Sequence, residues 1–385
     1  MASVHIQDLF WDRIKDVNDT NLGFLKSTVE NSLLDNIETP YFIYTGNGRI
    51  TELEDMEFSH DIVERLNSTG LYIFLYEPIC LRVGGEYNFS FYSECEYDAD
   101  NITSDELDSI LAFIKKNNLE SVKIYVTDYN TTCLQRVYPI LNITTSDIFL
   151  LGISVDLENK HSITNNFTKK FWCGNWRYTP HRHLIMSKLA TIDGNYSWHY
   201  HSDLEILKEN VWFNDFSDEI INQCKFLNSA SFSIDSFIEK KQVLSYRDHS
   251  IPLIPNQHLT KQLGKSYSDS FCAVVTETRY AQPMANISEK TLYPMFYKLP
   301  LIVVGAPYSL EYIKSLGFKT FDRWWDEGYD VIENHQDRLK KIFNVIDYIN
   351  SKSIQDLKKI YDEMHEVLDY NYQHTLNLKK HILKV

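Results

Sequence analysis

Residues 270–305 hold two apolar runs separated by a helical pattern, and this arrangement restricts the fold more than any other part of the chain. The runs Phe271–Val275 and Leu301–Val304 have the composition of strands that are buried on both faces. Parallel strands need a crossover connection, which is usually a helix, so a strand–helix–strand unit predicts a parallel pair. Ligands of such sheets bind beyond the carboxyl ends of the strands, where helices begin. The sequence therefore predicts an α/β protein with a binding edge around residues 276–290.

Polar residues occupy both places where this unit predicts the binding edge. The triplet 276–278 follows the first strand, and Ser288, Glu289 and Lys290 open the helix. A helix N-terminus and the Lys290 ammonium both favour an anion such as a diphosphate, and the Glu289 carboxylate can accept hydrogen bonds from ribose hydroxyls. A second interpretation needs no ligand, because Ser288 also fits a helix cap and Glu289 also complements the helix dipole.

Three motifs of this region resemble the donor-binding segment of the alpha-1,3-fucosyltransferases. They are Thr276-Glu277-Thr278, Ile287-Ser288-Glu289-Lys290 and the strand from Pro300 to Gly305. That family has Glu-Asn-Ser, then Thr-Glu-Lys, then a Pro-Val-Val-x-Gly strand, so this chain departs in having Glu-Thr for Glu-Asn and Ser for Thr. The family has the GT-B fold, in which two Rossmann-like domains face a cleft, and these motifs hold a nucleotide sugar. The resemblance implies that Glu277, Glu289 and Lys290 bind the donor.

The same half of the chain has two further likenesses. Segments 317–321 and 325–330 resemble uncharacterised viral and marine-phage proteins of glycosyltransferase type. In segment 170–184, a short aromatic strand leads through a loop to a helix start that carries Arg177 and Arg182. Cations beside a helix N-terminus suit a phosphate, and the fucosyltransferase-like proteins have an Arg here that contacts the donor phosphate. Arg182 is the better match and Arg177 the second, with an exposed basic helix start as the alternative.

Candidates for a metal site and for a general base have weaker support. Asp98-Ala99-Asp100 has the DxD form of metal-dependent glycosyltransferases, but we expect it in a polar loop before a helix. His181 and His183 are two residues apart and do not share a helical face. We expect no metal and no cofactor, with the nucleotide sugar as co-substrate. Glu77 follows the strand pattern 71–76 and is the candidate catalytic base, although a solvated carboxylate before a turn is the simpler interpretation.

The length of 385 residues allows two domains. Alternating strand and helix patterns predict an N-terminal α/β domain over residues 1–165 and a second α/β domain over 166–345. The resemblance implies that the first lies on the acceptor side and that the second binds the nucleotide sugar. Helical spacing predicts C-terminal helices over 346–385, and the resemblance implies that they cross back to the first domain. No apolar run reaches the ~20 residues that span a bilayer, and no signal peptide opens the chain. We therefore expect a cytoplasmic protein, in the host cytoplasm if it is viral.

These patterns and the resemblance together predict a glycosyltransferase. It would move a sugar from a nucleotide diphosphate sugar to an acceptor hydroxyl, and the resemblance implies inversion without a metal. The acceptor is a glycan or a hydroxymethylated base of phage DNA, and the net charge of −15 disfavours DNA. Two alternatives remain: a catalytically silent nucleotide- or glycan-binding protein, and a phosphotransferase. The latter rests on Gly264-Lys265-Ser266, which matches the end of a P-loop, but Leu259 stands where the first Gly of that motif belongs.

Overall fold

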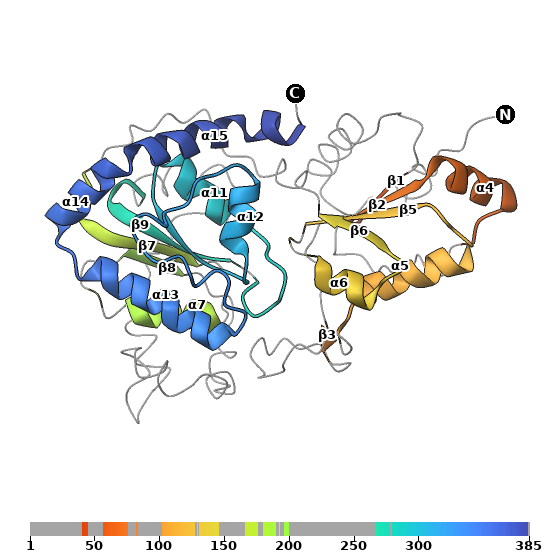
Figure 1. Cartoon of the computed structure of the whole chain (residues 1–385), viewed down its shortest axis with the longest axis horizontal. Helices are drawn as coiled ribbons and strands as arrows, with labels where there is room; N and C mark the ends of the chain where they lie inside the picture. Colours follow the sequence, from red (N-terminus) through yellow and green to blue (C-terminus); the bar gives the residue numbers. More distant parts are fainter. Residues whose placement is uncertain are drawn as a thin grey trace, which may run out of the picture. The chain divides into compact units, whose positions relative to one another are not determined.

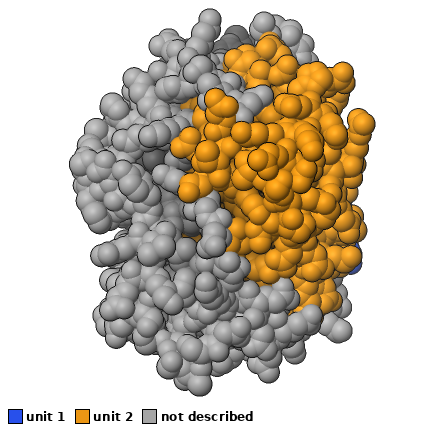
Figure 2. Space-filling view, turned by 90° about the vertical axis from the view of Figure 1, so that its left-hand side faces the viewer, with its two compact units in different colours: residues 1–89, 95–154, 379–385 blue, residues 90–94, 155–378 orange. Residues whose placement is uncertain are grey.

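Two four-stranded parallel sheets form the framework of the computed structural model, one in each of two units of the chain (Figure 1). Unit 1 comprises residues 1–89, 95–154 and 379–385, and unit 2 comprises residues 90–94 and 155–378. In the view of Figure 2 the described surface belongs almost entirely to unit 2. The structure describes residues 41–44, 57–75, 82–83, 102–127, 129, 131–145, 166–175, 180–189, 192, 196–199, 267–277 and 279–383.

The sheet of unit 1 has its strands in the order β1-β2-β5-β6, all of them parallel. Its central strands carry apolar residues that are almost fully buried, Ile73 and Phe74 in one and Ile124 in the next. The strands and helices described in this unit are β1 (Tyr41–Tyr44), α4 (His60–Thr69), β2 (Leu71–Leu75), β3 (Arg82–Val83), β4 (Ile102–Thr103), α5 (Asp105–Lys116), β5 (Val122–Val126), α6 (Thr132–Val137) and β6 (Asn142–Thr145).

The sheet of unit 2 has the order β10-β9-β7-β8 and is again parallel throughout. Every residue of β9 and β10 is buried, as expected for strands covered on both faces. The elements described in this unit are β7 (Lys169–Asn175), α7 (Pro180–Leu189), β8 (Tyr196–His199), β9 (Ser270–Thr276), α11 (Glu289–Phe296), β10 (Leu301–Val304), α12 (Ser309–Ser315), α13 (His335–Asn350), α14 (Ile354–Glu363) and α15 (His365–Leu383), the last turn of which belongs to unit 1.

Helices cover both faces of the sheet of unit 2. Helices α7 and α13 lie side by side on one face, and α11 and α15 lie on the other (Figure 1). The first pair is joined by an ion pair of 2.7 Å between Lys188 and Asp347. Right-handed crossovers explain why α7 and α11 lie on opposite faces of the sheet. The β7–α7–β8 and β9–α11–β10 connections run in opposite directions from the middle of the sheet, and a right-handed connection then places each helix on a different face.

The helix boundaries follow from local sequence. Ser288 caps α11, and its hydroxyl accepts a hydrogen bond from the Lys290 backbone N–H. Gly317 ends α12 with a positive φ of 92°. The hydrogen bonds from Gly317 N to Lys314 O and from Phe318 N to Ile313 O complete a Schellman motif there.

The predicted α/β class with two Rossmann-like units is confirmed, and so are the predicted strands and helices around residues 270–316 and the closing helices. The sequence prediction missed α6 and also β6, an edge strand in which Ile143 is the one buried residue. Residues 148–153 also have the apolar pattern of a strand, but this segment lies outside the described residues. Among the helices that the structure describes, none combines the length and apolarity required to cross a membrane.

Candidate active site

The order of strands in unit 2 creates a topological switch point between β7 and β9. From β7 the chain passes through α7 to β8 on one side, and from β9 it passes through α11 to β10 on the other side. Two neighbouring parallel strands therefore send their helices to opposite faces, and a crevice between the two loops is the usual ligand site of such a sheet. The two strands end at Asn175 and Thr276, and the Thr276 hydroxyl donates a hydrogen bond to Oδ1 of Asn175.

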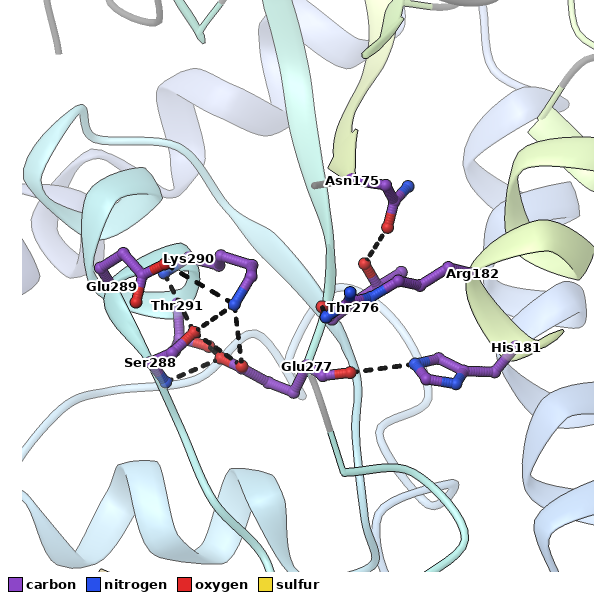
Figure 3. Close-up of polar contacts among 9 residues, drawn as sticks. All are labelled: Asn175, His181, Arg182, Thr276, Glu277, Ser288, Glu289, Lys290 and Thr291. Carbon is purple, nitrogen blue, oxygen red and sulfur yellow. Dashed lines mark hydrogen bonds and ion pairs between the residues drawn. The ribbon is translucent and has the colours of Figure 1, made fainter. Parts of the chain in front are cut away.

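Nine polar residues from both sides of this switch point form what we call the edge cluster (Figure 3). They come from the ends of β7 and β9 and from the first turns of α7 and α11. Its members are Asn175, His181, Arg182, Thr276, Glu277, Ser288, Glu289, Lys290 and Thr291.

Glu277 is the centre of the edge cluster and its side chain is completely buried. Its Oε1 accepts hydrogen bonds from Ser288 N at 2.9 Å and from Thr291 Oγ1 at 2.6 Å, and its Oε2 accepts one from Ser288 Oγ at 2.7 Å. Hydrogen bonds to a carboxylate are about twice as strong as neutral ones. Glu277 therefore ties the first turn of α11 to the end of β9.

Lys290 and Glu289 are the charged members of the cluster that reach solvent. The Lys290 side chain is 21% exposed, and its Nζ lies 2.9 Å from Ser288 Oγ and 3.8 Å from Glu277 Oε2. The Glu289 side chain is 46% exposed, with its Oε1 3.7 Å from Lys290 Nζ. A partly exposed ammonium beside a helix N-terminus can meet an anion from solvent with little rearrangement.

Helix α7 contributes a buried cation and a neutral imidazole to the same strand end. Arg182 is 1% exposed, and its guanidinium donates a hydrogen bond of 3.2 Å to the carbonyl of Thr276. His181 Nε2 lies 2.9 Å from the carbonyl of Glu277. A carbonyl only accepts, so Nε2 carries the proton. Burial, and next the charge of Arg182, hold the pKa of His181 well below its usual value, which keeps the ring neutral at physiological pH.

The side-chain charges of the edge cluster sum to zero, so the partial charges of the helix N-termini decide the sign of its electrostatic potential. Arg182 and Lys290 supply two positive charges, and Glu277 and Glu289 supply two negative ones. The N-termini of α7 and α11 each add roughly half a positive charge at this edge. The result is a locally positive edge on a chain whose net charge is −15. Such an edge favours an anionic ligand.

The structure thus brings together four of the six site residues predicted from the sequence: Arg182, Glu277, Glu289 and Lys290. It places Arg182 and Glu277 inside the protein, where one holds a backbone carbonyl and the other a helix start. Arg177 and Glu77 lie outside the described residues, as do Asp98, Asp100 and residues 264–266. Among the described residues, no three His, Cys, Asp or Glu side chains are grouped so as to hold a metal ion.

Asn175, Tyr280 and Arg338 also belong to this region and were not identified from the sequence. Arg338, from α13, is 1% exposed and donates to the carbonyls of Tyr280 and Glu333. The Tyr280 hydroxyl donates to the carbonyl of His335 at 2.6 Å. The position of Asn175 at the end of an apolar strand was a usable signal. Nothing local marks the contact of Arg338 with Tyr280, because the two residues are 58 positions apart in the sequence.

No family model and no curated protein matches this chain. Among solved structures it is similar to the pneumococcal O-GlcNAc transferase GtfA in complex with UDP and GlcNAc, at 12% identity and a TM-score of 0.38, covering 94% of this chain and 57% of that one. The chain therefore spans less than two thirds of the length of GtfA.

Two other solved structures show a similar degree of likeness. T4 phage BGT in complex with its UDP-glucose substrate is 9% identical, with a TM-score of 0.35 and coverage of 90% of this chain and 83% of that one. Spinosyn rhamnosyltransferase SpnG is 7% identical, with a TM-score of 0.28 and coverage of 88% and 99%. Likeness at this level does not bear on the chemistry of this chain.

Proposed function

We propose that this protein is a glycosyltransferase that binds a nucleotide diphosphate sugar at the edge cluster of unit 2. The observation that carries the proposal is the meeting of two helix N-termini and two cationic side chains at one switch point. A diphosphate carries the charge that such an edge attracts. The sequence resemblance to the donor-binding segment of the alpha-1,3-fucosyltransferases supports the same location.

The exposed and buried members of the cluster have different proposed roles. Lys290 contacts the diphosphate and stabilises the negative charge that develops as it leaves, and Glu289 accepts hydrogen bonds from ribose hydroxyls. Arg182 adds positive charge from beneath the surface, and Glu277 holds the start of α11 in place. A fixed positive site at the leaving group takes the place of a metal ion in this scheme.

The acceptor side of the proposal remains that predicted from the sequence. Glu77 is the proposed base that deprotonates the acceptor hydroxyl, and Arg177 is a proposed second contact to the donor phosphate. Transfer with inversion follows if the hydroxyl attacks opposite the departing diphosphate. The acceptor is a glycan or a hydroxymethylated DNA base, and the net charge of −15 favours the glycan.

A thermal-shift screen against UDP- and GDP-sugars tests the donor site, with CMP-sugars, which carry a single phosphate, for comparison. A ligand at a hundred times its Kd stabilises the native state by about 2.7 kcal/mol, which raises Tm by roughly 5–10 °C in a unit of this size. We expect such a shift with at least one donor, and its loss in Lys290→Ala. If no donor shifts Tm at millimolar concentration, the proposal fails. Donor hydrolysis in the presence of candidate acceptors then separates an enzyme from a silent binding protein.

A further inference from the structure

The first residues after β9 are held from the face of the sheet opposite to α11. From α7, His181 donates a hydrogen bond of 2.9 Å to the carbonyl of Glu277, and its ring stacks on that of Tyr280 with centroids 4.8 Å apart and planes 15° apart. From α13, the Arg338 guanidinium lies 4.6 Å from the centroid of the Tyr280 ring and also donates to the Tyr280 carbonyl. Glu277 and Tyr280 are therefore both fixed to the α7–α13 layer.

Glu277 connects the contact with His181 to the exposed part of the edge cluster. Its carbonyl points toward His181, and its carboxylate points away from it toward Ser288 and Lys290 (Figure 3). Both groups belong to one residue, so a displacement of the Glu277 backbone also displaces the carboxylate. Ser288 and Lys290 follow, because one donates to that carboxylate and the other forms an ion pair with it.

We propose that His181 is a positioning residue for Lys290 and that it acts through Glu277. This inference rests on the proposed function and adds to it. The hydrogen bond from His181 fixes the position of the Lys290 ammonium and the direction in which it faces a diphosphate. His181 is itself only 1% exposed and does not meet the ligand.

A neutral ring is suited to this position because charged groups surround it. Burial, and next the charges of Arg182 and Arg338, lower the pKa of His181, and its Nε2 faces the carbonyl of Glu277, the residue that follows β9. A lysine or arginine here would add a third buried cation, whose desolvation costs several kcal/mol. An imidazole donates the hydrogen bond without that cost, and its flat face also packs on Tyr280.

The test combines two substitutions of His181 with the removal of Lys290. His181→Phe keeps a flat ring for Tyr280 but removes the hydrogen-bond donor, whereas His181→Gln keeps a donor and removes the ring. Each is made in the wild-type and Lys290→Ala backgrounds. Ile185→Val is the control for general loosening of α7, because Ile185 is fully buried in that helix and the change removes one methylene group.

The first measurement needs no ligand. Lysines are reductively methylated with ¹³C-formaldehyde, and the Lys290 signal is assigned by its absence in Lys290→Ala. We expect His181→Phe to shift this signal, His181→Gln to restore it at least in part, and Ile185→Val to leave it in place. An unchanged Lys290 signal in a folded His181→Phe protein overturns the proposal. If His181→Phe does not fold, His181→Leu, which also lacks a donor, takes its place: a shifted Lys290 signal supports the proposal, and an unchanged one overturns it.

The second measurement is calorimetric titration with UDP and GDP. Residues that act through one another are not additive, with coupling that corresponds to at least a few-fold change in affinity. We expect His181→Phe to weaken nucleotide binding roughly fivefold in the wild-type background and less than twofold when Lys290 is absent. Equal losses in the two backgrounds overturn the positioning role. If the wild type binds neither nucleotide, the proposed function fails, and the Lys290 signal still decides the role of His181.

Discussion

Replacing Glu277 by Gln tests how strongly the buried carboxylate organises the edge cluster. The carboxylate accepts three hydrogen bonds, at 2.6, 2.7 and 2.9 Å, and lies 3.8 Å from Lys290 Nζ. An amide retains the two bonds to Oε1 in neutral form but presents an N–H₂ group to Ser288 Oγ and to the ammonium. Charge-assisted bonds are worth about 1.5–3 kcal/mol and neutral ones about 0.5–1.5, so weakening two bonds and losing the third costs about 3.5–6 kcal/mol.

Hydrogen exchange of peptides that cover α11 measures this loss locally, which suits a chain with two units. Because about 1.4 kcal/mol corresponds to a factor of ten, we expect α11 to exchange about 300 to 20,000 times faster in Glu277→Gln. Glu289→Gln is the matched control, since it makes the same chemical change in the first turn of α11 at a side chain that is 46% exposed. An exposed ion pair contributes about 0.2–1 kcal/mol at most. Equal exchange rates in the two variants would refute the structural role given to Glu277.

Three further predictions concern groups around the site. Burial, and next the charge of Arg338, lower the pKa of His335 to about 4, so the unfolded chain takes up a proton near pH 6.5 before the folded protein does. The free energy of unfolding therefore decreases as pH falls from 6.5 toward 4, by about 2 kcal/mol at pH 5. Urea titrations at pH 5 and 7.5 measure this decrease, and His335→Gln should lack the part that His335 contributes. Burial raises the pKa of the Cys173 thiol to about 12 and that of Cys272 further, so neither should react with Ellman's reagent until the protein unfolds, as mass spectrometry of the labelled peptides will show. A Cβ on Gly305 would lie 2.6 Å from Ser309 Oγ, so Gly305→Ala should cost about 1–3 kcal/mol in thermal melts, and less in a Ser309→Ala background.

The part of the site that lies on one strand–helix–strand unit was predictable from the sequence. Both strands are buried on two faces, so their apolar runs are unbroken, and Ser288 marks the start of the helix between them. Since the carboxyl end of a strand and the N-terminus of the next helix meet at one edge, Glu277 and Lys290 were expected to be close. The observed distance between their charged atoms is 3.8 Å.

Features set by tertiary structure were not predictable in this way. Strand β6 lies at the edge of its sheet and buries only Ile143, so its sequence has no apolar run that would predict a strand. The order of strands in unit 2 cannot be derived from the apolar patterns, because the edge strand β10 is as apolar and as buried as the central strand β9. Without that order, the switch point between β7 and β9 and the contact of Arg338 with Tyr280 could not be located.

A cation such as Arg182 at a helix N-terminus can bind a phosphate or a backbone carbonyl, and the sequence alone does not distinguish the two. The sequence placed a cation beside a helix N-terminus, where a phosphate contact is a reasonable expectation. The folded chain instead places the guanidinium against the carbonyl of Thr276, the last residue of β9. A cation held by a backbone carbonyl cannot follow a ligand, but it also does not need to reorganise when charge develops nearby. Fixed charge of this kind stabilises a departing diphosphate more effectively than a mobile side chain does, because the cost of orienting it is met during folding. Under the proposed function, Arg182 would therefore contribute positive electrostatic potential at the diphosphate, and Lys290 would contact the diphosphate directly.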